Sequence, residues 1–282
     1  MAQSKAKCKL LTLNTHSWQE ADNTSCLRHV TEAVLAEQPD VIALQEVNQS
    51  EKGQAAGIER LTASGYSTAG FVINENNWAL CLAEALRQKG LAYQWSWGFA
   101  HVGYRTWAEG VAVLSRKPIL EVRTTDISDP GLAADSWRHR RVLAIRNADG
   151  WFCSVHTGWW EDAEDPFAGQ WQRLNDFTKT MDGSRYLMGD FNCPAHLRHQ
   201  GYHLMTASGW QDCYARADEK DGGVTVPGQI DGWRQEQVDG FRLDLCLAGQ
   251  AGHTLCSRVI FNGGFYPVVS DHFGVLTWEG ED

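Results

Sequence analysis

The sequence has little proline, no long apolar run and a shortage of positive charge. Its apolar stretches, such as residues 41–44, are far shorter than the roughly 20 residues that cross a bilayer, so we expect no transmembrane helix and no membrane partner. Too few apolar residues follow the N-terminal lysines for a signal peptide, and a cytoplasmic location is expected. The chain carries 25 Lys and Arg against 35 Asp and Glu, and this net charge of −10 argues against tight binding to nucleic acid.

Cysteine patterns and linkers are absent too. The eight cysteines form no Cys-x-x-Cys pair, which argues against a zinc site or a disulfide framework. No repeat, low-complexity tract or Pro/Gly/Ser-rich linker interrupts the chain, so residues 1–282 are expected to form a single domain. What the sequence has in excess is tryptophan, with thirteen residues. Most of these rings are expected in the core, and those beside polar groups are candidates for stacking on a sugar or a base.

Apolar periodicity predicts an α/β fold that is rich in strands. Residues 9–14 and 41–44 have the pattern of short buried strands, and residues 26–37 between them have helical spacing. Two more helices are predicted at residues 78–89 and 166–180. Further strands are predicted at residues 91–98, 110–115, 118–123, 141–146, 151–156, 186–188, 242–247, 257–261 and 273–278. Long polar loops are expected at residues 47–77, 99–109, 124–138 and 191–240.

Polar residues stand at the ends of several predicted strands, where packing does not require them. They are Asn14, Gln45, Glu46, His156, Asp190, Asn192, Asp271 and His272. One such residue alone is usually a turn or cap residue, but this set comes from five strands and contains only oxygen ligands and imidazoles. Oxygen ligands suit Mg²⁺, or Mn²⁺, better than zinc. We therefore expect a divalent metal site at one edge of the fold.

These residues lie in motifs that resemble the endonuclease/exonuclease/phosphatase superfamily of metal-dependent phosphoesterases. The motifs occur in the order typical of that family: Leu13-Asn14, Leu44-Gln-Glu-Val47, Gly110-Val-Ala-Val-Leu-Ser-Arg116, His156, Gly189-Asp-Phe-Asn192, Arg242-Leu-Asp244 and Ser270-Asp-His272. A single motif of this kind is common by chance, whereas the whole set in order is specific. The resemblance implies a four-layer α/β/β/α sandwich, in which two mixed sheets pack face to face and the site lies at one edge.

The resemblance also implies a metal site. Glu46 is the expected principal ligand of Mg²⁺, because a carboxylate at a rigid strand end can hold the ion and leave positions open for water and phosphate. Asn14 is expected beside Glu46, and Asp271 is expected to complete the ligand set.

The remaining motif residues are expected to act on water and phosphate. Asp190 would orient or deprotonate the attacking water, and Asn192 would donate hydrogen bonds to a phosphate oxygen. His156 would contact the phosphate from the opposite side. His272 would also bind the phosphate, with Asp244 holding its ring in one tautomer. The sequence leaves open whether Asp190 or His272 is the general base.

Longer segments resemble a narrower group, the bacterial maltose 6'-phosphate phosphatase type. They are residues 11–18, 44–48, 109–112, 154–160, 230–233 and 269–274. This likeness implies a small sugar phosphate as substrate, and it places Trp159, Trp160 and Trp233 in loops around the sugar. Arg141, or one of its neighbours Arg138 and Arg140, is a candidate phosphate clamp. Glu109 is a candidate ligand of a sugar hydroxyl, or an acid that supports the site from behind its ligands. Core packing is the alternative for the tryptophans, and a solvated basic strand end is the alternative for the arginines.

Three other functions remain open. A nuclease of the same superfamily should offer a basic face, whereas loops 124–138 and 157–170 carry Asp126, Asp129, Asp135, Glu161, Asp162, Glu164 and Asp165. A sphingomyelinase-like phosphodiesterase should have an apolar membrane loop or a basic cluster, and neither is found. A non-catalytic binding module has no physical reason to keep so many carboxylates together. The sequence favours a Mg²⁺-dependent phosphomonoesterase for a small phosphorylated metabolite, and it leaves the sugar and the oligomeric state undetermined.

Overall fold

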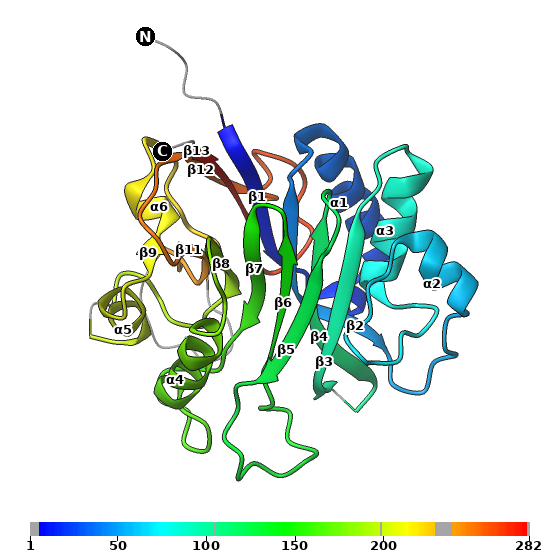
Figure 1. Cartoon of the computed structure of the whole chain (residues 1–282), viewed down its shortest axis with the longest axis horizontal. Helices are drawn as coiled ribbons and strands as arrows, with labels where there is room; N and C mark the ends of the chain where they lie inside the picture. The colour runs from blue at the N-terminus through cyan, green and yellow to red at the C-terminus, as the bar shows by residue number, and fades with distance from the viewer. Residues whose placement is uncertain (1–5, 104, 198, 229–238, 281–282) are drawn as a thin grey trace.

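Both faces of the central strands are apolar, and the computed structural model shows what covers each face. The structure describes residues 6–103, 105–197, 199–228 and 239–280. Two sheets pack face to face, and helices lie against the outer face of each, which gives four layers (Figure 1). The predicted four-layer α/β/β/α sandwich of two mixed sheets is therefore confirmed.

The first sheet has seven strands in the order β10-β12-β13-β1-β2-β4-β3. The central pair, β1 and β2, is parallel, and both of its flanking neighbours, β13 and β4, run antiparallel to it. The bounds are β1 Ala6–Asn14, β2 Val41–Ser50, β3 Gln94–Gly103, β4 Trp107–Ser115, β10 Glu219–Lys220, β12 Thr254–Ile260 and β13 Gly274–Gly280.

The second sheet has six strands in the order β5-β6-β7-β8-β11-β9. Here β7 and β8 are parallel, and the other pairs are antiparallel. The bounds are β5 Glu121–Asp126, β6 Arg141–Asn147, β7 Gly150–His156, β8 Arg185–Asp190, β9 Gln211–Asp212 and β11 Asp244–Ala248. The two sheets meet mainly through β1, β2 and β4 on one side and β6, β7 and β8 on the other.

The helices divide between the two outer layers. Their bounds are α1 Asn23–Glu37, α2 Ile58–Ser64, α3 Trp78–Gln88, α4 Phe167–Thr178, α5 Gly201–Ala207 and α6 Cys213–Arg216, with a short 3₁₀ turn η1 at Ser17–Gln19. Helices α1 and α3 cover the seven-stranded sheet, and α4 and α5 cover the six-stranded sheet (Figure 1). Asp22 caps α1 and Asn77 caps α3 by accepting backbone N–H bonds. Within the described ranges, no helix is both long enough and apolar enough to cross a bilayer.

Alternation along the strands separates the core into layers. Leu10 and Ala43 belong to the cluster between the sheets, whereas their neighbours Leu11 and Leu44 belong to the cluster under α1 and α3. The layer between the two sheets also contains polar side chains, and Gln45 Nε2 donates to Ser154 Oγ at 2.8 Å. This hydrogen bond satisfies two buried polar groups directly below the ends of both sheets.

Three segments expected to be loops contain regular structure, so these predictions were wrong. Residues 47–77 include the second half of β2 and helix α2, residues 99–109 belong largely to the β3–β4 hairpin, and residues 191–240 include α5, β9, α6 and β10. The second half of β2 is polar in sequence and still buried, because Gln49 hydrogen-bonds the backbone of Val72 and Asn74. Apolar periodicity does not detect a strand that is held by side-chain amides.

Candidate active site

Strand register brings the predicted residues to the same end of both sheets. In the six-stranded sheet, parallel pairing places His156 of β7 beside Asp190 of β8, and antiparallel pairing places Asp244 of β11 on the other side of Asp190. In the seven-stranded sheet, the end of β1 at Asn14 pairs with the part of β2 that immediately precedes Glu46. Residues that are far apart in sequence therefore meet at one edge of the sandwich.

Glu46 lies at an irregularity within β2 rather than at its end. The pairing of β2 with β4 shifts between Leu44 and Val47, and Glu46 has a left-handed backbone with φ of 51°. Such a bulge redirects the side chain out of the regular alternation of the strand. Asn14 Nδ2 donates to Glu46 Oε1 at 2.8 Å and to Asp190 Oδ2 at 3.3 Å. One amide thus joins a carboxylate of each sheet.

The turn that carries Asp190 and Asn192 needs positive φ angles at two positions, and the sequence has Gly and Asn there. Gly189 has φ of 153°, and a Cβ there would overlap the carbonyl oxygen of Val155 on the neighbouring strand. Asn192 is left-handed, with φ of 45°, a conformation that Asn tolerates better than most residues. Its backbone N–H donates to Asp190 Oδ1 at 2.8 Å, and its Nδ2 donates to the carbonyl of Thr157 at 2.9 Å. The Asp190 carboxylate is therefore fixed by the turn itself.

His272 is oriented by Asp244. Its Nδ1 lies 2.9 Å from Asp244 Oδ2, and its Nε2 lies 3.7 Å from Asp190 Oδ2. Burial lowers the pKa of His272, but the charges of Asp244 and Asp190 outweigh that effect and hold the pKa well above its usual value. The raised pKa favours the protonated ring, which suits His272 to donate a hydrogen bond rather than to accept a proton.

Asp190 lies between two imidazoles of different charge. Burial raises the pKa of Asp190 to about 7, against the opposing effect of His272. His156 Nε2 lies 3.6 Å from Asp190 Oδ2, and burial together with the charge of Arg140 holds the pKa of His156 well below its usual value. A carboxylate with a pKa near neutrality, flanked by one charged and one neutral imidazole, is suited to accept a proton from water.

Beside these residues lies a buried arginine that makes no ion pair within the described part of the chain. Arg140 is 5% exposed, and its Nη1 donates to the carbonyls of Trp137 at 3.1 Å and His139 at 3.2 Å. Its Nε is buried and has no hydrogen-bond partner in the part of the chain that the structure describes. Burial lowers the pKa of Arg140, while Glu109 and Glu46 act in the opposite direction. A buried cation without a close counter-ion is costly, and a bound anion would remove that cost.

Glu109 does not neutralise Arg140. Burial and the charge of Glu46 raise the pKa of Glu109 to about 8, so this carboxyl holds a proton at neutral pH. Its Oε1 lies 3.4 Å from Nε2 of His101, whose Nδ1 is 2.9 Å from the carbonyl of His139. Because a carbonyl only accepts, Nδ1 carries the proton and Nε2 can accept from Glu109. Glu109 and His101 thus form a neutral pair along the wall of the site.

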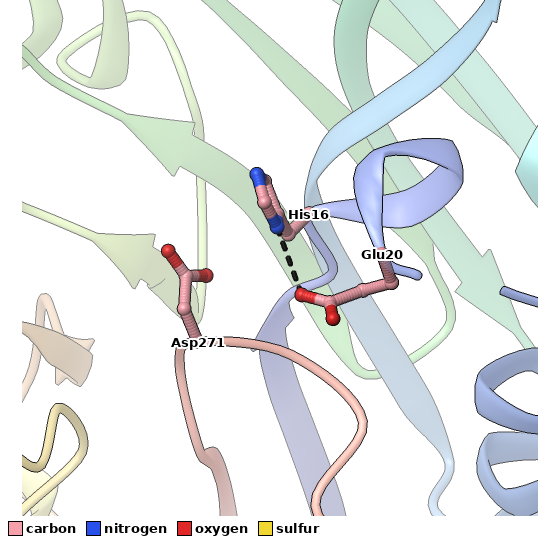
Figure 2. Close-up of side chains that lie close together, drawn as sticks. All are labelled: His16, Glu20 and Asp271. Carbon is pink, nitrogen blue, oxygen red and sulfur yellow. Dashed lines mark hydrogen bonds and ion pairs between the residues drawn. The ribbon is translucent and has the colours of Figure 1, made fainter. Parts of the chain in front are cut away.

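Asp271 lies at the exposed rim of the same edge. Ligand atoms of His16, Glu20 and Asp271 all lie within 4.8 Å of one another. Figure 2 shows His16 Nδ1 bonded to Glu20 Oε1 at 2.8 Å, with Asp271 facing them from the segment before β13. The backbone N–H of His16 also donates to Asn14 Oδ1 at 3.3 Å, which links the rim to the expected metal site. The role of Asp271 as a metal ligand stays a prediction.

Arg141 has contacts away from these residues. Its Nε donates to the carbonyl of Phe99, and its guanidinium lies 5.1 Å from the ring centre of Phe71. Arg141 shares a strand face with Leu143, which packs between the sheets. Arg140 precedes this strand, which begins at Arg141, and its guanidinium has different contacts. The predicted clamp at Arg141 is not brought to Asp190 by any contact of the described residues.

The three tryptophans expected around the substrate have different surroundings. Trp160 is partly buried against Phe167 at the start of α4, with ring centres 6.2 Å apart. Trp159 lies beside a separate apolar cluster next to β11, formed by Val226, Phe241 and Leu243. Trp233 lies outside the described residues. The substrate-binding roles of all three stay predictions.

The donors around Glu46 fit a hard divalent cation. Glu46, Asn14 and Asp190 offer carboxylate and amide oxygens, and Glu46 raises the pKa of both Asp190 and Glu109. A divalent cation would relieve this repulsion between carboxyl groups in a buried site. Glu46 and Asn14 would hold the ion, and Asp271 could complete the ligand set from the rim.

The comparison with known families agrees with this geometry. A model described as the Endonuclease/Exonuclease/phosphatase family matches residues 11–272. The chain belongs to this family. The resemblance inferred from the motifs is confirmed, and membership of this family supports a phosphoesterase activity. A comparison with curated protein sequences found no significant match.

Several solved structures of the Endonuclease/Exonuclease/phosphatase family resemble this chain. A family protein from Leptotrichia buccalis is 28% identical, with a TM-score of 0.84 over 97% of this chain and 100% of that one. The mannosyl-6-phosphatase of Bacteroides thetaiotaomicron is 14% identical, with a TM-score of 0.62 over 98% and 100%. The 3' phosphatase NExo from Neisseria, bound to a product DNA hairpin, is 18% identical, with a TM-score of 0.63 over 97% and 100%. At such identities the last two show the fold alone.

Proposed function

We propose that the protein is a Mg²⁺- or Mn²⁺-dependent phosphomonoesterase that releases phosphate from a small sugar phosphate. The observation that carries this proposal is the buried guanidinium of Arg140, whose Nε has no partner among the described residues. Arg140 and the imidazolium of His272 are close enough to His156 that both of their charges lower its pKa. Two buried cations around one neutral imidazole suit a dianion, which is the charge of a phosphomonoester near neutral pH. A phosphodiester carries only one negative charge.

The residues around Asp190 account for the chemistry of hydrolysis. Asp190, fixed by the backbone N–H of Asn192, would take a proton from the attacking water. Arg140 would hold two phosphate oxygens with its planar guanidinium, while His272 and Asn192 donate to the oxygens on which charge accumulates. His156, which is neutral, can donate one N–H to the phosphate without adding charge. A divalent cation held by Glu46 and Asn14 would neutralise phosphate charge and favour ionisation of water.

The acidic loops support a small substrate over a nucleic acid. Some of their carboxylates are paired: Asp162 and Glu164 with Arg138, and Asp129 with Arg173. Asp135 and Glu161 make no ion pair within the described ranges. DNA binding depends on several phosphate contacts at once, and unpaired carboxylates beside the site would repel the phosphates next to the scissile one. The mannosyl-6-phosphatase among the structural neighbours is in line with this choice, and the 3' phosphatase NExo bound to a DNA hairpin keeps a nucleic-acid substrate as the alternative.

Phosphate release from a panel of substrates tests the proposal. The panel contains maltose 6'-phosphate, mannose 6-phosphate, glycerol phosphate, a 3'-phosphorylated oligonucleotide and supercoiled plasmid, each with Mg²⁺, with Mn²⁺ and with EDTA. We expect the sugar phosphates to have the highest kcat/KM, and we expect EDTA to abolish the reaction. An Asp190→Asn variant purified in parallel reports contaminating phosphatase.

Two results would contradict the proposal. Efficient nicking of plasmid at low enzyme concentration, with no phosphate released from any sugar phosphate, would identify a nuclease. Full activity in EDTA would remove the metal from the mechanism.

A further inference from the structure

Trp137 is an exposed aromatic residue whose ring is nevertheless held in place. The residue is 44% exposed and lies in the loop between β5 and β6. The guanidinium of Arg138 lies 4.6 Å from its ring centre, and the ring of Trp159 lies 5.7 Å away at an interplanar angle of 65°. Arg138 is itself fixed by Asp162 and Glu164, each at 2.9 Å. An exposed ring fixed in this way loses little entropy when a ligand stacks on it.

Trp137 and Trp159 are connected along the chain or through the backbone to Arg140 and His156, the residues proposed to contact the phosphate. The carbonyl of Trp137 accepts the hydrogen bond from Nη1 of Arg140 at 3.1 Å. Trp159 follows His156 by three residues at the end of β7. Its indole Nε1 is buried and has no hydrogen-bond partner within the described ranges. Trp137 is therefore joined through its backbone to Arg140, and Trp159 lies close in sequence to His156.

We propose that Trp137, supported by Trp159 and Arg138, is the binding platform for the pyranose ring of the substrate. This rests on the proposed phosphomonoesterase function and adds the position of its sugar subsite. The apolar C–H face of a pyranose covers an indole ring well, and the carboxylates around Arg138 offer acceptors for sugar hydroxyls. Trp160 does not share this position, because it packs against Phe167 over α4.

The test compares a substrate that can stack with one that cannot. For each variant, kcat/KM is measured with maltose 6'-phosphate and with glycerol phosphate, and the ratio of the two values is the readout. Trp137→Ala should lower this ratio about tenfold, because it removes the apolar area under the sugar. Trp137→Phe, which keeps a flat ring, should restore most of the ratio. Circular dichroism verifies that both variants are folded.

Phe265 provides a matched control. It is 48% exposed and lies between β12 and β13, and the guanidinium of Arg258 lies 4.8 Å from its ring centre. Like Trp137, it is an exposed aromatic ring beside an arginine. Phe265→Ala should leave the substrate ratio unchanged. An equal drop in the ratio for Phe265→Ala and Trp137→Ala would overturn the platform, because the effect would then be general.

Direct binding separates failure of the platform from failure of the proposed function. Calorimetry in the Asp190→Asn background measures the affinity for maltose 6'-phosphate and for a 3'-nucleotide without turnover. Binding of the sugar phosphate that Trp137→Ala weakens about tenfold supports the platform. If Trp137→Ala hydrolyses and binds sugar phosphates as well as the protein with Trp137 does, the platform is wrong and the proposed function is unaffected. A loss confined to the nucleotide would show that Trp137 stacks on a base, and no binding of any sugar phosphate would contradict the function itself.

Discussion

The charge of His272 is set by two carboxylates rather than by solvent. Asp244 lies 2.9 Å from its Nδ1, and Asp190 lies 3.7 Å from its Nε2. Because both are acidic, they keep the ring protonated where burial alone would not. The same imidazolium opposes the rise that burial causes in the pKa of Asp190. The charge states of His272 and Asp190 therefore depend on each other, as expected for a pair of groups whose environments separate their pKa values.

Asp244→Asn should shift the basic limb of the pH profile. The protonated form of His272 is present below its pKa, and Asp244 raises that pKa, so loss of the charge lowers it. The activity that needs the imidazolium should then disappear at lower pH than in the parent protein. Measurement of kcat/KM from pH 5 to 10 at saturating Mg²⁺ tests this. An unchanged basic limb would show that the charge of His272 is not required.

Arg140→Gln should weaken substrate binding more than it slows turnover. The guanidinium is already in place before substrate binds, and a uniformly bound phosphate affects KM more than kcat. Loss of one bidentate charged contact should raise KM about 10- to 100-fold. Arg141→Gln is the matched control, because its guanidinium contacts Phe99 and Phe71 instead. A larger effect for Arg141 than for Arg140 would restore the prediction made from sequence.

Among the elements, the regular apolar strands were predictable and the irregular ones were not. The pattern of residues 9–14 and 41–44 indicated β1 and the first half of β2, but β2 continues to Ser50 through the bulge at Glu46. The sequence pattern predicted a strand end at Glu46, whereas the structure has a bulge within β2 there, and the role of Glu46 as a metal ligand stays a prediction. Helices α2 and α5 have seven residues each, too short for clear periodicity.

Sequence motifs identified candidate site residues by their type, but they did not show which of these side chains pack together. Asp190, Asn192 and His272 were found through motifs, and register explains why they converge with Asp244. The choice between Arg140 and Arg141 depends on which side chain faces the neighbouring sheet, and residue identity alone does not give that. His101 was missed because its segment was read as a loop.

Gly189→Ala tests the join between β7 and β8. A methyl group at this position would overlap the backbone carbonyl of Val155, and φ of 153° disfavours any side chain. The substitution should lower the free energy of unfolding by about 2–4 kcal/mol and displace Asp190. Urea denaturation measures this, with Gly222→Ala as control because nothing lies within 4 Å of a Cβ there. Equal stability of Gly189→Ala and Gly222→Ala would show that the contact between Gly189 and Val155 can relax without loss of stability.

At the scale of the whole molecule, several carboxyl groups are brought together at one edge of the sandwich. The net charge is −10, and Glu46, Asp190, Glu109 and Asp244 lie at one edge of the sandwich with raised pKa values for Asp190 and Glu109. In the absence of a cation these carboxyl groups work against folding, because each must be buried or brought near another. The site is thus stabilised less than the core between the sheets, and its stability should depend on ions in solution.

Addition of Mg²⁺ should therefore raise the melting temperature, and Glu46 should be responsible for most of the rise. A ligand that binds only the folded state at 100 times its Kd adds about 2.7 kcal/mol, which corresponds to a rise of several degrees for a protein of this size. Glu46→Gln removes the main charged ligand, so the rise in melting temperature at the same Mg²⁺ concentration should nearly vanish. In EDTA the melting temperature of this variant should not fall, because one of the carboxylates that repel each other has been removed. Thermal scans with and without Mg²⁺ measure both effects. Glu32→Gln is the matched control, since this exposed residue of α1 pairs with Arg28 at 3.1 Å, and it should retain the full Mg²⁺ response. If Glu46→Gln responded to Mg²⁺ as strongly as the control, the ion would be bound elsewhere and the assignment of Glu46 would be wrong.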